Sequence, residues 1–295
     1  MERGKLNVDF AGKIAEFEML LNKVIPKKML YRFLARGKGI EFDSYRNFGS
    51  DEDASLIDWK ASIRSNNLLA RQYVQEKNLN VMFVVDVGEN MVFGSQEKLK
   101  CEYTAEMVAA LSHSIINSGD QIGFILFNNT FAKLSPIRPG KKQLDILLYN
   151  LLDPYLYKGT SNIGDNLNSL VELLNPSVSM VILISDFLRV NENQKNDFEM
   201  LGNLFETVAI MVRDPLDKTL PDINKEMILE SYNGDRLLIN PSLVKKTYEL
   251  GVEKQTAFVR DLFQKSKIDL LELDTRNDFA LDLATFLKRR VDRRD

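Results

Sequence analysis

Short apolar runs in the middle of the chain predict strands that are buried on both faces. Three such runs contain no polar residue and are each followed directly by one: Val81–Val85, Met180–Ile184 and Val208–Val212. Uninterrupted runs of about five apolar residues favour parallel strands covered by helices on both sides, because neither face of the strand meets water. Ile122–Phe127 is predicted to be a further strand of the same sheet.

The segments between these strands carry apolar residues at helical spacing. The predicted helices are 98–118, 144–152, 167–174 and 198–205. Asn128-Asn129 predicts a tight turn into a short antiparallel strand, Thr130–Leu134, at an edge of the sheet. Strands that alternate with helices in this way predict an α/β fold with a doubly wound, mostly parallel sheet.

The alternation of strands and helices stops before residue 79 and after residue 214, which predicts that the chain has three parts. Residues 1–78 form an N-terminal segment packed on the core, 79–214 form the core, and 215–295 form a C-terminal extension that completes the sheet. In the first part, Phe17–Leu34 has the pattern of an amphipathic helix, or of two helices broken near Pro26, with its apolar face against the body of the protein.

The C-terminal extension begins with a strong hairpin signal. Asn233-Gly234 lies between Met227–Ser231 and Arg236–Ile239, which predicts two short antiparallel strands joined by a tight turn. A long helix, a last strand and a closing helix are predicted at 244–266, 269–273 and 279–291.

One Cys and one His among 295 residues exclude several kinds of site. A lone Cys cannot form an internal disulfide, and one Cys with one His cannot build a zinc site of about four ligands. We interpret His113, inside a predicted helix, as a structural or surface residue, and leave open a reactive role for the Cys101 thiol near the start of that helix.

The net charge and the hydropathy of the chain indicate which partners and which cellular location to expect. The net charge of −3 argues against nucleic acid as the main partner. The first residues mix charges and lack the apolar core of a signal peptide, and the longest apolar runs are far shorter than the ~20 residues that span a bilayer. We therefore expect a cytoplasmic protein without an integral membrane segment.

Polar side chains follow two of the buried strands, where open α/β sheets bind ligands. Asp86 and Asp186 come at these strand ends, and Thr160 lies in a loop after Gly159. Two buried carboxylates on neighbouring strands repel each other unless a cation or hydrogen-bond donors lie between them. The sequence leaves two alternatives: a hard-cation site, for which Mg²⁺ is suited, or aspartates that cap loops through backbone N–H groups.

This layout resembles a von Willebrand factor A domain. The metal-ion-dependent adhesion site of such domains reads Asp-x-Ser-x-Ser after the first strand, with a Thr in a Gly-Thr loop and an Asp after the fourth strand. The resemblance implies Asp86, Asn90, Thr160 and Asp186 as metal ligands. Gly88 and Asn90 stand where the two serines are expected, so the implied Mg²⁺ site is degenerate.

A second resemblance begins in the N-terminal third and extends over about residues 36–290. The elements Glu41-Phe42, Arg46-Asn47-Phe48, Ile57-Asp58-Trp59 with Arg64, and Glu76 are similar to the signature of a bacterial family known as domain of unknown function 58. The chain departs from that signature at Asp51–Ser55, where Gly-Asp-Asp-x-Arg is expected.

The family resemblance implies a non-enzymatic adaptor that works with a MoxR-type AAA+ ATPase. It marks Trp59, Arg64, Arg46 and Asp58 as candidate partner-binding residues. A structural alternative stays open, in which Arg46 and Arg64 pair with Asp58 and nearby acids, and Trp59 packs the N-terminal segment onto the sheet.

Three functions follow from these features. The first is an interaction module that binds a protein partner at the degenerate metal site, and the second is a metal-independent scaffold that keeps the site as a relic. The third, a metal-dependent hydrolase, has less support. Asp165-Asn166 stands where a phosphate-binding loop needs Lys-Ser/Thr, and the chain has no Gly-x-Ser-x-Gly elbow.

Overall fold

The computed structural model describes residues 6–24, 41–49, 55, 57–65, 67–74, 78–223, 225–230 and 236–292. Its N-terminal part contains α1 (Phe10–Val24), β1 (Glu41–Asn47), α3 (Trp59–Ser65) and β2 (Leu69–Val74). The central strands are β3 (Asn80–Asp86), β4 (Gln121–Phe127), β5 (Phe131–Arg138), β6 (Met180–Ser185), β7 (Glu206–Arg213) and β10 (Asp269–Asp274). The helices around them are α4 (Lys100–Asn117), α5 (Lys141–Leu151), α6 (Ile163–Leu173), α7 (Lys195–Leu204), α8 (Pro241–Lys265) and α9 (Phe279–Asp292).

The central strands form one six-stranded sheet in the order β10-β7-β6-β3-β4-β5. All neighbours are parallel except β5, which runs antiparallel to β4 at the edge. The predicted fold class, a doubly wound and mostly parallel α/β sheet, is confirmed. The strand order reverses between β3 and β6, so a crevice is expected where the carboxyl ends of these two strands meet.

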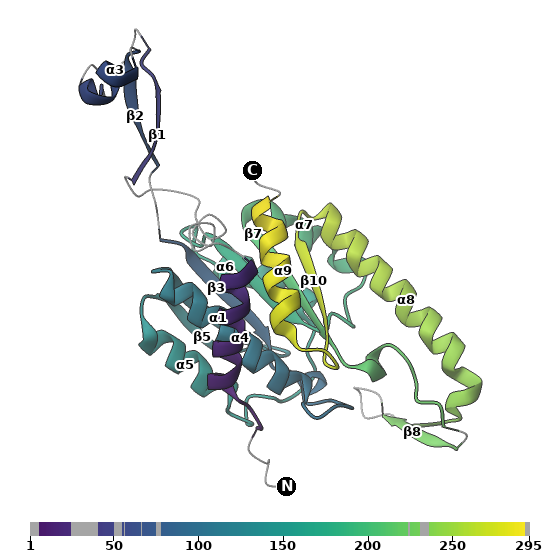
Figure 1. The fold of residues 1–295 in the computed structure, drawn as a ribbon. Helices are drawn as coiled ribbons and strands as arrows, with labels where there is room; N and C mark the ends of the chain where they lie inside the picture. Colours follow the sequence, from purple (N-terminus) through teal and green to yellow (C-terminus); the bar gives the residue numbers. More distant parts are fainter. Residues whose placement is uncertain are drawn as a thin grey trace.

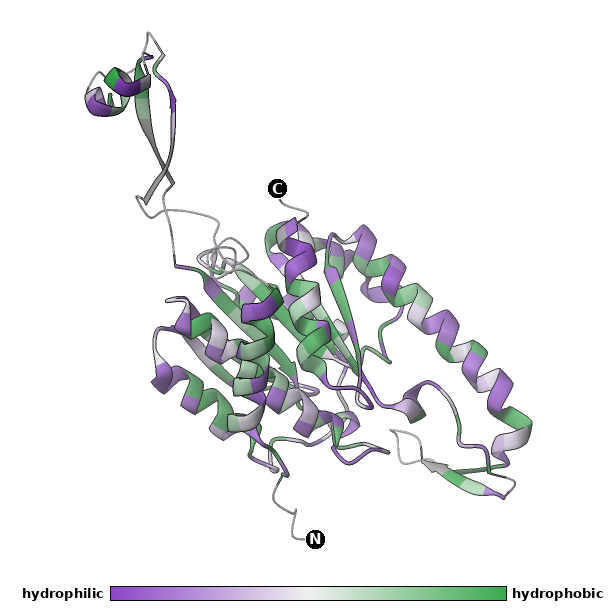
Figure 2. Ribbon diagram, in the orientation of Figure 1, coloured by the Kyte–Doolittle hydropathy of each residue, from purple (hydrophilic) through white to green (hydrophobic). Residues whose placement is uncertain are grey.

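Helices cover both faces of the sheet because successive side chains of each strand point to opposite sides. On β3, Val81, Phe83 and Val85 pack with α1, α4, α5 and α9, whereas Met82 and Val84 pack with α6, α7 and α8. Figure 2 shows the apolar residues gathered on the sheet and on the helix faces that meet it. Burial on both faces is why these strands read as continuous apolar runs.

The described N-terminal residues form two separate structures. Helix α1 packs against α4, and the backbone N–H groups of Asn7 and Asp9 just before it donate to the Glu102 and Glu106 carboxylates of α4. Strands β1 and β2 pair with each other, and α3 lies against β2, forming an arm that projects from the body in Figure 1. The part of the predicted helical stretch 17–34 beyond Val24 lies outside the described residues.

The C-terminal extension adds an edge strand and a helix to the core. β10 pairs with β7 along its whole length, and α9 packs beside α1 on the same face of the sheet. Strands β8 (Met227–Glu230) and β9 (Arg236–Ile239) form the predicted hairpin, whose Asn233-Gly234 turn lies outside the described residues. Among the described residues, no helix is long and apolar enough to cross a membrane.

Candidate functional site

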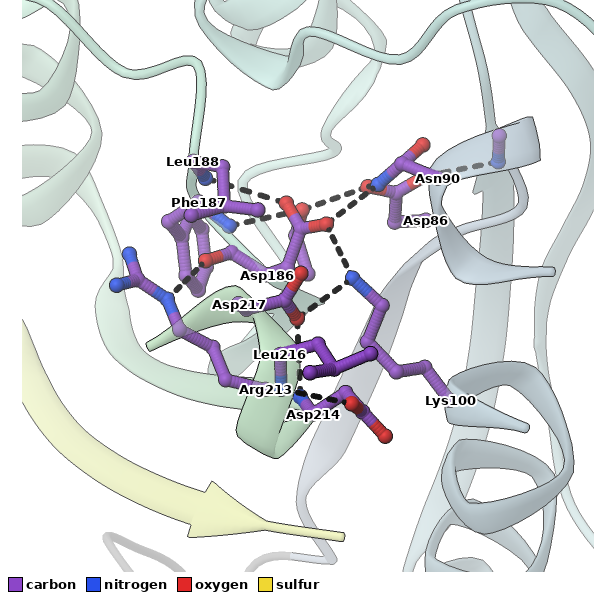
Figure 3. Close-up of polar contacts among 12 residues, drawn as sticks. Asp86, Asn90, Lys100, Asp186, Phe187, Leu188, Arg213, Asp214, Leu216 and Asp217 are labelled. Carbon is purple, nitrogen blue, oxygen red and sulfur yellow. Dashed lines mark hydrogen bonds and ion pairs between the residues drawn. The ribbon is translucent and has the colours of Figure 1, made fainter. Parts of the chain in front are cut away.

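The carboxyl ends of β3 and β6 bring two of the predicted site residues together. Asp86 is the last residue of β3, and Asp186 directly follows β6; both are buried. The side-chain amide of Asn90, on a short 3-10 turn after β3, donates to both carboxylates, at 3.1 Å to Asp86 Oδ2 and 3.0 Å to Asp186 Oδ2. Figure 3 shows Asn90 between the two aspartates. Adjacent parallel strands thus place these side chains at the switch point.

Asp86 is held by three groups. Its Oδ1 accepts from the backbone N–H of Gly88 at 2.8 Å, and its Oδ2 accepts from the Ser185 hydroxyl at 2.6 Å as well as from Asn90. Burial, together with the nearby charge of Asp186, raises the pKa of Asp86 to about 6, although these hydrogen bonds oppose the shift. Asp86 therefore caps its loop through a backbone N–H group, as the second alternative from the sequence requires.

Asp186 faces a cation that the sequence analysis did not identify. Lys100, the first residue of α4, is completely buried, and its Nζ lies 2.9 Å from Asp186 Oδ2. Burial alone would raise the pKa of Asp186, but the Lys100 ammonium and the hydrogen bonds from Asn90, Lys100 and the Leu188 N–H lower it below its usual value. Asp186 is therefore an ionised carboxylate with an internal counter-ion.

The same ammonium binds a second carboxylate from the C-terminal extension. Lys100 Nζ lies 2.9 Å from Oδ2 of Asp217, on the 3-10 turn η4 (Pro215–Asp217). Asp217 Oδ2 also accepts from the backbone N–H of Asp214 at 2.9 Å. Burial raises the pKa of Asp217, partly offset by the charge of Lys100. One buried ammonium thus connects the start of α4 with segments after β6 and after β7 (Figure 3).

The loop that carries Thr160 closes over the strand end. The Gly159 carbonyl accepts from the backbone N–H of Glu89 at 2.9 Å, which places this loop against the turn after β3. Thr160 is half-buried in the loop, and the next residue, Ser161, is buried with a hydroxyl that has no hydrogen-bond partner. A Cβ on Gly88 would lie 2.4 Å from the Ser161 Cβ and 2.3 Å from Asn90 Oδ1. The loop therefore occupies the space of a side chain at position 88.

These residues do not fit the Mg²⁺ that the fold class implies. Asn90 turns its donor nitrogen, not its oxygen, toward both aspartates, and Lys100 places a positive charge on Asp186. Position 88 has no side chain, and Ser161 fills the space where a serine hydroxyl would stand. Within the described part of the chain, no three Cys, His, Asp or Glu side chains converge in a way that could hold a metal ion.

The remaining candidate residues lie in the arm, where some are buried and others are exposed. Asp58 is buried: its Oδ1 accepts from the backbone N–H groups of Lys60 and Ala61, which caps α3, and its Oδ2 accepts from the Tyr45 hydroxyl at 3.1 Å. Trp59 is 60% exposed, so the interpretation in which it packs the N-terminal segment onto the sheet is wrong.

The two arginines of the arm have backbone partners. Arg64 is exposed and donates from Nε to the Lys60 carbonyl at 3.2 Å, and Arg46 donates to the Asn47 carbonyl at 3.4 Å. Glu76 and the acidic residues 51–53 lie outside the described residues.

His113 and Cys101 lie apart from this chemistry. His113 Nδ1 is 3.1 Å from Glu18 Oε1, so this pair joins α4 to α1. Cys101 is buried in the first turn of α4, and burial, together with the charge of Glu102, raises the pKa of its thiol to about 12. The raised pKa argues against the reactive role left open for Cys101.

Sequence reasoning missed Lys100 and Asp217, because nothing in their local pattern marks them as buried. Arg213, the last residue of β7, is also buried, and its Nε donates to the main-chain carbonyl of Asp186 at 3.0 Å.

The strand order, the antiparallel edge strand and the polar cluster at the switch point define a von Willebrand factor A-like α/β protein. The chain belongs to the family described as "Protein of unknown function DUF58", whose family model matches residues 44–257. Among curated proteins, it is 24% identical over 262 residues to the uncharacterized protein Rv1480 of Mycobacterium tuberculosis, covering 87% of this chain and 81% of that protein. The uncharacterized protein Mb1516 of Mycobacterium bovis matches to the same extent.

Two solved structures of similar proteins have low sequence identity to this chain. The conserved hypothetical protein BatB from Bacteroides thetaiotaomicron aligns with a TM-score of 0.48 and 14% identity, covering 73% of this chain and 100% of that one. The SpRpn10 VWA domain aligns with a TM-score of 0.43 and 12% identity, covering 70% and 94%.

Proposed function

We propose that this chain is a non-enzymatic protein-interaction module that works as an adaptor for a MoxR-type AAA+ ATPase. Membership of the family supports the partner, and the von Willebrand factor A-like fold supports a role in protein recognition. The chemistry of the described residues also supports a role without catalysis. The lone thiol is buried with a raised pKa, and the strand-end carboxylates are neutralised by groups of the chain itself.

The observation that carries this proposal is the surface of α3. Trp59 and Ile63 stand one helical turn apart and are 60% and 80% exposed. Lys60 and Arg64 are exposed beside them, again one turn apart. A large aromatic side chain flanked by basic groups is typical of an interface hot spot. We infer that this face of α3 contacts an apolar patch with an acidic rim on the ATPase.

Rigid support of α3 is consistent with a binding role. The Ser62 hydroxyl donates to the Asp58 carbonyl at 2.8 Å and accepts from the backbone N–H of Leu69 at 2.9 Å, which ties α3 to β2. Ala61 and Ala70 are buried between them. The large side chains of Trp59 and Ile63 are exposed on the outside of α3, where they can contact a partner.

A binding assay with purified ATPase tests the proposal. We expect Trp59→Ala to weaken binding about 30-fold, the loss typical of a hot-spot residue. Tyr149→Ala is the matched control, because Tyr149 is 77% exposed on α5, in a different part of the molecule. Equal affinities of the two variants would remove α3 from the interface, and lack of binding by the unmodified chain would refute the proposed partner.

A second pair of variants separates the surface of α3 from its fold. Asp58→Ala removes the carboxylate that caps α3, whereas Asp58→Asn keeps an acceptor that caps helices almost as well. We expect the Ala variant to lose binding and hydrogen-exchange protection in α3 together, and the Asn variant to keep both. Binding that survives loss of protection would show that a folded α3 is not required.

A further inference from the structure

The cluster at the switch point contains a positive charge in a completely buried position. Lys100 Nζ makes two contacts of 2.9 Å, to Oδ2 of Asp186 and to Oδ2 of Asp217, and it lies 5.6 Å from the ring centroid of Phe93. Burying an ammonium is costly unless carboxylates and hydrogen bonds compensate it. A lysine placed here is therefore matched to two acids that would otherwise repel each other in the interior.

The second donor in the cluster is the Asn90 amide. Its Nδ2 bridges Asp86 Oδ2 and Asp186 Oδ2 at 3.1 and 3.0 Å, so it lies where a cation between the two strand ends would stand. A serine hydroxyl at this position could bind a metal ion, but it has one hydrogen to donate, whereas the Asn90 amide nitrogen has two. The two carboxylates are therefore joined by hydrogen bonds from Asn90.

We infer that the Lys100 ammonium and the Asn90 amide together replace the divalent cation of the adhesion site, so that this edge of the sheet is a metal-independent structural lock. The lock connects Asp86 on β3, Asp186 after β6 and Asp217 in the C-terminal extension. Because Lys100 is completely buried, its ammonium is not available to a carboxylate on a partner protein. Recognition at this edge therefore does not proceed through a carboxylate bound to a metal.

The packing around Gly88 supports the same conclusion independently of charge. Any Cβ at position 88 would meet the Ser161 Cβ at 2.4 Å, closer than side-chain carbons approach in proteins. The space that a coordinating serine would need is thus filled by the protein. This inference does not depend on which partner binds α3.

Thermal unfolding of the full chain in EDTA and in millimolar MgCl₂ tests the lock. We expect the two melting temperatures to agree within about 1 °C, because a ligand that does not bind the native state cannot stabilise it. We expect Lys100→Met, a neutral side chain of similar length, to lower the melting temperature by about 6 °C or more, since it leaves buried carboxylates without their cation. Lys195→Met is the control, because Lys195 and its partner Glu199 on α7 are both exposed.

Lys100→Ala extends the test by opening space beside Asp186. We expect Mg²⁺ or Mn²⁺ to raise the melting temperature of this variant but not that of Lys195→Ala, because only the former leaves two buried carboxylates facing an opening. If neither Lys100 variant folds while both Lys195 variants do, the loss still supports an essential buried cation. A rise in the melting temperature of the unmodified chain with Mg²⁺, or equal melting of Lys100→Met and Lys195→Met, would overturn the inference.

Discussion

The guanidinium of Arg213, the last residue of β7, donates from Nε to the main-chain carbonyl oxygen of Asp186 at 3.0 Å. Its other nitrogens donate to side chains of α8, at 2.7 Å to Thr256 and 3.2 Å to Gln255. The Gln255 amide donates in turn to the Phe187 carbonyl at 3.1 Å. Arg213 and Gln255 thus hold α8 against the strand end that carries Asp186. In Figure 3 the side chains of Arg213 and Lys100 lie on opposite sides of Asp186.

This relationship predicts that Arg213 is more important for stability than a surface arginine. Arg213→Met removes the donor of the buried Asp186 carbonyl and of the half-buried Thr256 and Gln255 side chains, and we expect it to lower the free energy of unfolding by about 3 kcal/mol, measured by urea denaturation. Arg260→Met removes only an exposed pair with Glu272 and should cost at most about 1 kcal/mol. Similar small losses for both variants would contradict the role given to Arg213.

The close approach of Ser161 to Gly88 predicts a compensating pair of substitutions. Gly88→Ala should cost about 1–3 kcal/mol of stability, because its Cβ would lie 2.4 Å from the Ser161 Cβ and force the loop to move. Ser161→Gly in the same chain removes that contact but not the one with Asn90 Oδ1, and should recover part of the loss. A double-mutant cycle in urea measures the coupling, and strictly additive effects would show that the two positions do not interfere.

Cys101 should be unreactive while the protein is folded. Burial raises the pKa of its thiol to about 12, so at pH 8 only on the order of one molecule in ten thousand carries the thiolate that alkylating reagents attack. Mass spectrometry after iodoacetamide treatment should find native protein almost unmodified and protein unfolded in guanidinium fully modified. Rapid modification of the native protein would revive a reactive role for Cys101.

Asp274 should contribute to stability at neutral pH and progressively less as the solution becomes more acidic than about pH 4. Burial opposes ionisation, but hydrogen bonds from Arg276 and Lys218 outweigh it and lower the pKa of Asp274 below its usual value. The native state thus binds this proton less readily than the unfolded chain, whose Asp pKa is about 3.9. The contribution is therefore present above about pH 4 and is lost as the pH falls toward the lowered pKa of the native state.

The measurement compares urea denaturation of Asp274→Asn with that of the unmodified chain at pH 7 and pH 3. We expect the variant to be less stable at pH 7 and the difference to be smaller, but not abolished, at pH 3, because pH 3 lies between the pKa of Asp in the unfolded chain and the lowered pKa of the native state. Asp261→Asn is the control, since Asp261 is 58% exposed and pairs only with Lys265 one turn along α8. A constant difference between Asp274→Asn and the unmodified chain at both pH values would contradict the predicted linkage.

The central strands could be predicted because a strand buried on both faces is a continuous run of apolar residues in the sequence. Val81–Val85 became β3 with one polar residue added at each end, and Met180–Ile184 became β6 with Ser185 added. The edge strand was predicted less completely. β5 extends to Arg138, well past the predicted end at Leu134, because its outer side is exposed and its residues carry no continuous apolar run. Pro136 lies within it, which an edge strand tolerates.

The candidate site was predicted in part for the same reason. Asp86 and Asp186 follow apolar runs, and parallel strands bring such ends together. For Trp59 the sequence left two alternatives, a partner-binding residue or one that packs onto the sheet, and in the structure its side chain is 60% exposed. Exposure depends on what the rest of the chain places nearby, which the local pattern does not record.

By itself, the sequence determined the α/β alternation, the places where strands end in acids, and the loss of both serines from the adhesion motif. These are properties of short segments, set by burial period and residue type. Only the tertiary structure decided what neutralises the acids. In the sequence, Asp186 lies 86 positions and Asp217 117 positions after Lys100. The three side chains meet because α4, β6 and η4 converge at one edge of the sheet. The energy of a buried charge depends on such neighbours, so its role follows from the fold.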